Sequence, residues 1–331
     1  MSPSRLRSVA AALAFAFAFV IALPVAGAEP VRLAGHSLGW AAEIEVRDLE
    51  RDAAGAAIAD AFDELERARR AARSLEQRAR GGEPVALDAT EAALLRRLQG
   101  LCYWSEGTLG PAGGELLRLW GAGAPAAALP TREVLEPAVE SARCERLTLA
   151  ADPPRLELAT ASSLALGPFE VGWAVDRAAE RLAAHGATNF WIAVGPVARA
   201  AGGGPDGRGW RFAPPRLAGQ EQPLAPFHLR DQALALLTPD QRPLRIAGER
   251  FPPFVDYRRG RPAGSAVAVL VVSELAVDAA AVGYVMFARG PADGTLLLGN
   301  LTERPSIRWL LGTGGGPPLL TDVNWGVVSR R

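Results

Sequence analysis

A short segment with three arginines, Arg258, Arg259 and Arg261, carries side chains suited to binding a phosphate group. Guanidinium groups form strong charge-assisted hydrogen bonds to phosphate oxygens. A solvated turn is the commoner fate of such a cluster, and Asp256 just before it would then brace the turn. Both interpretations, phosphate contact and solvated turn, stay open at this point.

Several kinds of catalytic site are excluded by what the chain lacks. It contains no lysine, so a P-loop lysine, a Schiff-base lysine and a Ser-Lys dyad are impossible. The chain also has no nucleophile elbow, no metal-binding histidine pair and no dinucleotide-binding glycine motif before a suitable helix. The glycine-rich stretch 202–207 is best interpreted as a loop between strands. The three histidines, His36, His185 and His228, receive no catalytic role.

Charge and cysteine content narrow the class of protein further. The chain has 36 basic and 36 acidic residues, which argues against nucleic acid or an anionic membrane as its main partner. Cys102 and Cys144 could form a disulfide in an oxidising compartment, although two buried thiols are the favoured alternative. No second cluster of cysteine or histidine is present to build a zinc site.

The N-terminus has the organisation of a secretory signal peptide. Arg5 and Arg7 precede an apolar run from Ala10 to Leu23, and the segment 26–28, Ala-Gly-Ala, stands before Glu29. The apolar run is shorter than the roughly 20 residues of a spanning helix. We therefore expect residues 1–28 to be removed, leaving an exported, soluble domain of residues 29–331 with no stable membrane span.

Hydrophobic periodicity predicts the helices and strands that must position the candidate functional residues. Helices are predicted where apolar residues recur at three- and four-residue steps, and strands where they alternate or form short continuous runs. The segment 31–46 contains an alternating strand with Ile44 and Val46 on one face. The capping box of the second helix is Asp88 with Glu91. Predicted helices are 54–80, 88–100, 172–184 and 276–289; predicted strands are 190–197, 233–237 and 266–272; the segment 121–130 is predicted to be a surface loop.

Their order indicates an α+β fold. Strands follow helices without the strict alternation of a doubly wound sheet. The run 266–272 is almost entirely apolar, so that strand is expected to be buried. Gly186 provides the left-handed stop that commonly ends a helix. No interior linker divides residues 29–331.

The segment LGPFEVGWAVD, residues 166–176, resembles the central signature D-L-G-G-I-A-K-G-Y-A-V-D of the ApbE-like FAD:protein FMN transferases. The matching residues are Leu166, Gly167, Gly172, Ala174, Val175 and Asp176. Val171 stands where the family has its lysine.

Further segments resemble family motifs in the family's order. Residues 38–40 (LGW) correspond to M-G-T, and 105–121 (SEGTLGPAGGELLRLWG) to S-G-G-x-F-D-P-T-V-G-P-L…L-W-G. Residues 193–198 correspond to N-x-G-G-D-I, 253–262 (PFVDYRRGRP) to H-I-I-D-P-R-T-G-R-P, and 277–283 to A-D-A-x-x-T-A. The changes include Gly110 for aspartate and Ala112 for threonine.

The resemblance implies a fold, a cofactor and a metal. The fold would be ApbE-like and T-fold-related, with mixed sheets packed against helices. Gly167, Gly195, Asp256 and Arg258 would belong to the FAD-binding residues. Mg²⁺ would be held by Asp278, with the carboxylate of Glu170 compensating for Val282, which replaces the family's threonine ligand. Asp278 could instead cap the helix that begins near it, and Asp176 is expected to be structural.

The function implied is the Mg-dependent transfer of FMN from FAD to a threonine of an exported redox flavoprotein. In that reaction a threonine hydroxyl attacks phosphorus and the pyrophosphate bond of FAD breaks. The alternative is a non-catalytic flavin- or protein-binding accessory in periplasmic redox-protein assembly, which the lost motif residues favour. Either protein would be exported and periplasmic.

Overall fold

An eight-stranded antiparallel sheet is the centre of the structure, a computed structural model that describes residues 29–264, 266–301, 303–313 and 316–328. The expected signal peptide, residues 1–28, lies outside the described residues. The strand order is β1-β2-β6-β7-β10-β15-β16-β17. Its strands are β1 Val31–Ser37, β2 Trp40–Val46, β6 Phe190–Val194, β7 Val197–Ala201, β10 Gln232–Leu237, β15 Ala266–Ser273, β16 Ser306–Leu311 and β17 Leu319–Val323.

The middle strands are buried on both faces. Along β10, Ala233, Ala235 and Leu237 face the larger hydrophobic core, whereas Leu234 and Leu236 face a second, smaller one. Side chains of a strand point alternately to the two faces, so a strand covered on both sides must be apolar throughout. The predicted burial of the run 266–272, now in β15, is confirmed.

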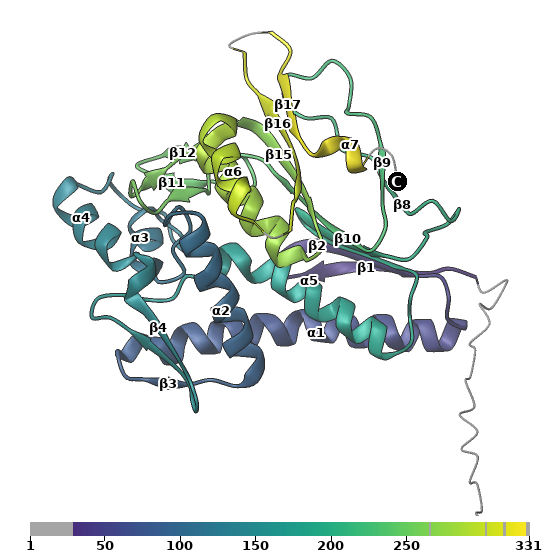
Figure 1. Ribbon diagram of the computed structural model, residues 1–331, viewed down its shortest axis with the longest axis horizontal. Coiled ribbons are helices and arrows are strands. Elements are labelled where there is room, and N and C mark those ends of the chain that lie inside the picture. Colours follow the sequence, from purple (N-terminus) through teal and green to yellow (C-terminus); the bar gives the residue numbers. More distant parts are fainter. Residues whose placement is uncertain (1–28, 265, 302, 314–315, 329–331) are drawn as a thin grey trace, which may run out of the picture.

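Helices cover one face of the sheet, and a hairpin with a short helix covers the other. α1 and α5 run side by side below the sheet in Figure 1, and α6 packs on β10 and β15. On the opposite face, Trp210 and Phe227 of the β8–β9 hairpin pack with Trp325 of α7. These elements are α1 Arg51–Arg78, α5 Gly167–Ala184, α6 Ala276–Leu297, α7 Trp325–Val328, β8 Trp210–Phe212 and β9 Phe227–Leu229.

A smaller group of elements lies at the left of Figure 1, beside the ends of α1 and α5. A disulfide joins Cys102 of α2 to Cys144, with a Cα–Cα distance of 5.8 Å, so the favoured expectation of two buried thiols was wrong. The group consists of α2 Ala89–Trp104, α3 Gly114–Leu119, α4 Arg132–Ser141, β3 Val85–Ala86, β4 Leu147–Ala151 and β5 Pro154–Leu158. Short hairpins β11 Leu244–Ile246 with β12 Glu249–Phe251, and β13 Val255–Asp256 with β14 Arg261–Pro262, complete the described α-helices and strands.

The predicted α+β class is confirmed, and local differences have local reasons. The segment 31–46 forms two strands, because Leu38 and Gly39 adopt left-handed backbone conformations and make a hairpin turn. Helix α5 begins at Gly167 rather than Gly172, since Pro168 suits a first helical turn. The capping box of Asp88 with Glu91 is present at α2. Helix α6 runs past 289 across a kink at Gly290.

Candidate functional site

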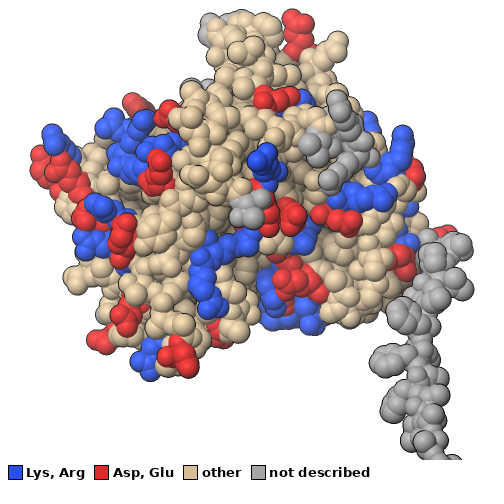
Figure 2. Space-filling view, in the orientation of Figure 1, with Lys and Arg blue, Asp and Glu red and all other residues tan. Residues whose placement is uncertain are grey.

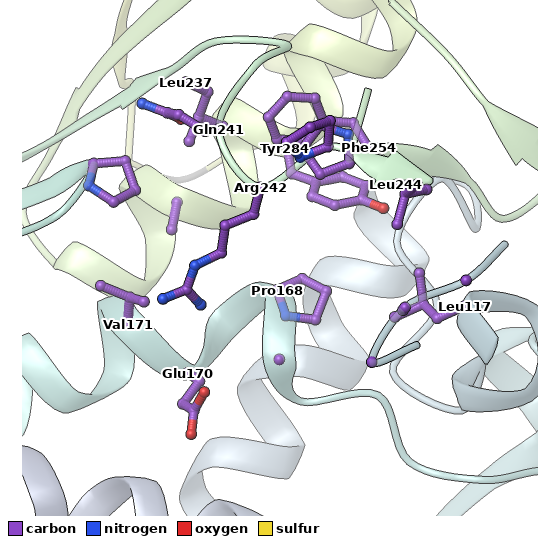
Figure 3. Close-up of a pocket in the computed structure, with 18 of the residues that line it drawn as sticks. Leu117, Pro168, Glu170, Val171, Leu237, Gln241, Arg242, Leu244, Phe254 and Tyr284 are labelled. Atoms are coloured by element: carbon purple, nitrogen blue, oxygen red, sulfur yellow. The ribbon is translucent and has the colours of Figure 1, made fainter. Parts of the chain in front are cut away.

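A cavity of about 560 Å³ opens between the start of α5, the middle of α6 and the loop after β10; we call it the main cavity (Figure 3). Its volume is in the range of small-molecule sites, which are concave and mostly apolar. Its walls are predominantly apolar, and Phe254 and Tyr284 contribute aromatic rings. The charged side chains among its lining residues are Glu170, Arg242 and Arg245.

Segments that resemble family motifs meet at this cavity, although they are far apart along the chain. Each of them contributes at least one lining residue: Trp40 from 38–40, Gly121 from 105–121, Gly167, Pro168, Glu170 and Val171 from 166–176, Pro196 from 193–198, Pro253 from 253–262 and Ala280 from 277–283. Only the folded chain brings them together.

The start of α5 forms one wall. Leu166 donates its backbone N–H to the carboxylate of Glu76 in α1, at 2.7 Å, which holds this end of the helix in place. Gly172 lets α5 approach α6 closely, because a Cβ there would lie 2.6 Å from the carbonyl oxygen of Ala276. Gly167 and Val171 therefore line the cavity at a fixed distance from α6.

Arg242 is the cation that enters the main cavity from the loop after β10. Its Nη2 donates to the carbonyl oxygens of Leu38 and Gly39, at 2.8 and 2.7 Å. Its guanidinium lies over the ring of Trp40, 4.0 Å from the centroid. Burial lowers the pKa of Arg242 from its usual value. In Figure 3 the guanidinium extends toward Val171, where the resemblance places a lysine.

Glu170 lies on the same wall but points away from Arg242 (Figure 3). Its Oε1 atom is buried without a hydrogen-bond partner among the described residues. Burial raises the pKa of its carboxyl, and nearby Arg73 and Arg69 oppose that shift. This carboxylate is thus costly to ionise where it stands.

Gly195 packs against the indole ring of Trp40, which lines the main cavity. It makes the turn between β6 and β7 with a φ of +53°, and a Cβ there would lie 2.5 Å from the indole ring. Its neighbour Pro196 lines the cavity, but Gly195 is not itself among the lining residues.

Asp256 and Arg258 lie at a different place. Asp256 is fully buried and accepts the backbone N–H of Arg258 at 3.0 Å, so it braces the turn as expected. The side chain of Arg258 lines a separate cavity of about 380 Å³ with Glu106 and Cys144. The structure therefore does not bring Asp256 and Arg258 to the main cavity with Gly167.

The ring of Tyr257 explains why Gly110 stands where the resembling motif has aspartate. Tyr257 stands where the resembling motif has proline, and its buried ring lies over Gly110 and Gly113. A Cβ at Gly110 would lie 2.6 Å from this ring, so an aspartate could not be accommodated there.

Asp278 is held by an arginine that the sequence did not single out. Both of its carboxylate oxygens accept hydrogen bonds from Arg97 of α2. The pair lines a third cavity, of about 400 Å³, together with Val282. Asp278 does not cap α6: Asp176 does, because its carboxylate accepts the backbone N–H groups of Ala276 and Val277 at 2.9 Å each.

The donor set does not fit Mg²⁺. Asp278 and Glu170 line different cavities, and both oxygens of Asp278 are engaged by Arg97. Val282 supplies no oxygen. Within the described ranges, no group of three or more His, Cys, Asp and Glu side chains could hold a metal ion. Mg²⁺ prefers near-octahedral oxygen ligation, so these residues as arranged supply too few ligands.

Sequence reasoning missed Arg242 and Arg97 because neither lies in a motif. Arg242 has a positive φ of +50°, which cannot be predicted from the fact that the residue is an arginine. Arg97 lies on the polar side of a predicted helix, and this position does not indicate that its partner is Asp278, 181 residues away.

An antiparallel sheet with helices on one face and a mainly apolar cavity where separate motif segments meet defines the class as an α+β protein with a cavity of small-molecule size. The sequence profile of the ApbE family matches residues 38–307. The chain belongs to the ApbE family.

Individual relatives agree with this assignment. The FAD:protein FMN transferase of Vibrio cholerae is 27% identical over 229 residues, which is 66% of this chain and 64% of that protein. The ApbE protein of Thermotoga maritima has a TM-score of 0.77 at 20% identity, covering 92% of this chain and all of that one. The flavin transferase ApbE of Vibrio cholerae has a TM-score of 0.74 at 22% identity, covering 90% and 97%. These structural likenesses concern the fold.

Proposed function

We propose that this protein binds a flavin nucleotide in the main cavity and takes part in the maturation of an exported redox flavoprotein. The observation that carries the proposal is the convergence of the motif-like segments on this one cavity. FAD would be held by the walls at Gly167, Pro168 and Val171, together with Trp40 and Arg242. The resembling motif has polar residues at the positions of Gly110 and Ala112, but neither position lines the main cavity, so these changes do not by themselves remove a flavin contact there.

The arrangement favours a non-catalytic accessory over a transferase. FMN transfer to a threonine breaks the pyrophosphate bond of FAD, and the charge that develops there requires a positioned cation. Asp278 is instead paired with Arg97, and Val171 replaces the lysine of the resembling motif. The acceptor of the family's reaction would then be a binding partner rather than a substrate.

Mg-dependent transfer of FMN to a threonine is the second candidate, favoured by the retained Asp278 and by the named activity of the Vibrio cholerae relative. The deciding experiment incubates the protein with FAD, Mg²⁺ and a threonine-bearing acceptor peptide, and follows covalent flavin by mass spectrometry. We expect little or no covalent flavin on the acceptor peptide. Robust transfer that is lost in Asp278→Ala would establish the second candidate instead.

Export to the periplasm is also proposed here. The disulfide between Cys102 and Cys144 supports an oxidising compartment. In the described part of the chain, no helix is both long enough and apolar enough to cross a bilayer. On the face shown in Figure 2, acidic and basic side chains are interspersed.

A further inference from the structure

The loop that carries Arg242 holds its guanidinium at the wall of the main cavity. Arg242 has a left-handed backbone, with a φ of +50°, which non-glycine residues adopt at a cost. Gln241 ties the loop to the end of β10, since its side chain accepts from the backbone N–H of Thr238 at 3.1 Å and donates to the carbonyl of Leu236 at 3.0 Å. Backbone strain that the surrounding structure maintains is concentrated at functional sites.

The turn below the guanidinium fits it closely. Gly39 has a φ of +73°, and a Cβ there would lie 2.6 Å from Nη2 of Arg242. Glycine suits the left-handed turn at position 39, and a side chain there would displace the guanidinium from its place over the turn. The ring of Trp40 and the two carbonyl oxygens orient the guanidinium but do not neutralise it.

Arg242 forms no close ion pair with a carboxylate of the described residues. Over the described ranges, no Asp or Glu oxygen lies within 4.0 Å of an Arg242 nitrogen. The acid on the same wall, Glu170, points away from it in Figure 3. The charge of Glu170 acts on Arg242 and raises its pKa against the lowering by burial, so the two groups interact without forming an ion pair. Arg242 is exposed as a residue, and its guanidinium at the wall of a mainly apolar cavity is therefore accessible to an anionic group of a ligand.

We propose that Arg242, presented by the turn of Leu38 to Trp40, forms an anion subsite of the main cavity that binds the phosphate or pyrophosphate group of a nucleotide ligand. The apolar part of that ligand would lie against the walls that Phe254 and Pro168 contribute. The inference deepens the proposed flavin binding and rests on it for the identity of the apolar part.

The test compares flavins that share a ring and differ in phosphate. Riboflavin, FMN and FAD are titrated by flavin fluorescence into the wild type, Arg242→Met, Arg242→Lys and the control Arg250→Met. Arg250 is an exposed arginine of the neighbouring hairpin that does not line the cavity. We expect Arg242→Met to weaken FMN and FAD binding by about ten- to hundredfold and to leave riboflavin unchanged. Arg242→Lys should retain part of the affinity, and Arg250→Met all of it.

A second titration uses inorganic pyrophosphate alone, followed by calorimetry at low and high salt. If pyrophosphate binds the wild type and not Arg242→Met while no flavin binds at all, the anion subsite stands and the proposed flavin function fails. Equal loss of riboflavin and FMN in Arg242→Met would mean that the arginine only supports the fold, which overturns the inference. Absence of pyrophosphate binding to the wild type would overturn it as well.

Discussion

The carboxylate of Asp278, near the start of α6, is bound by the guanidinium of Arg97 in α2. The aspartate is almost fully buried, whereas the arginine side chain is 39% exposed. The charge that a metal ion would have supplied at Asp278 is provided by the chain itself. The pair also joins the smaller group of elements to the helix that covers the sheet.

Breaking this pair should destabilise the fold. Arg97→Met leaves a buried carboxylate without its partner, and we expect a loss of about 2–4 kcal/mol in the free energy of unfolding, measured by urea denaturation. Asp278→Asn should cost less, since the guanidinium left behind can reach solvent. The double variant should lose less than the sum of the two singles. Additive losses would show that the two side chains do not interact.

Mg²⁺ should leave the wild-type protein unchanged. With Arg97 on Asp278 and Glu170 in another cavity, millimolar Mg²⁺ is expected to produce no shift in Tm. The Asp278→Ala variant is the control. An Mg²⁺-dependent rise in Tm of the wild type that disappears in Asp278→Ala would establish the metal assignment that the sequence suggested.

Glu170→Gln should make the protein as stable as the wild type or more so at pH 7. Burial raises the pKa of this carboxyl above its usual 4.5, so the folded state holds the proton to higher pH than the unfolded chain does. The wild type therefore loses stability as pH rises from 4.5 through the folded pKa, and the glutamine variant lacks this loss. A gain of up to about 1 kcal/mol at pH 7, vanishing below pH 4.5, is expected from urea midpoints. A destabilised variant at pH 7 would contradict this interpretation.

Two glycine-to-alanine changes in helices should have opposite effects. In Gly172→Ala the new methyl group would meet the backbone of Ala276 and Val277, and we expect a loss of about 1–3 kcal/mol. In Gly55→Ala, within α1, nothing lies within 4 Å of the added Cβ, so a gain of about 0.5–1 kcal/mol is expected. Thermal denaturation of both variants distinguishes close helix packing from helix propensity.

Removal of the disulfide should lower stability without changing the fold. Cys102 and Cys144 close a loop with a sequence separation of 42 residues. The double change to alanine is expected to cost about 2–4 kcal/mol, chiefly by enlarging the unfolded ensemble. A reductant should reproduce the effect in the wild type and have none in the variant.

Exported material should begin at Glu29, within a residue or two, when its N-terminus is sequenced. The charged start, the apolar run and the segment 26–28 motivate this expectation. Recovery of the full-length chain only, and only in membranes, would contradict it.

The sequence determined the class of fold, the family and most of the elements, since these depend on local patterns. The apolar run of β15, the capping box of Asp88 with Glu91 and the glycine after α5 act on neighbouring residues, so their consequences can be derived without the tertiary structure.

The contents of the site were decided only by the tertiary structure. Asp176 caps a helix that begins 100 residues later, and Arg97 binds Asp278 across 181 residues. The cysteine pairing and the entry of Arg242 into the main cavity depend in the same way on which surfaces meet. A long charged side chain can reach several possible partners. Its burial, and the charges that folding brings close to it, decide which partner it binds. No local sequence pattern encodes that choice.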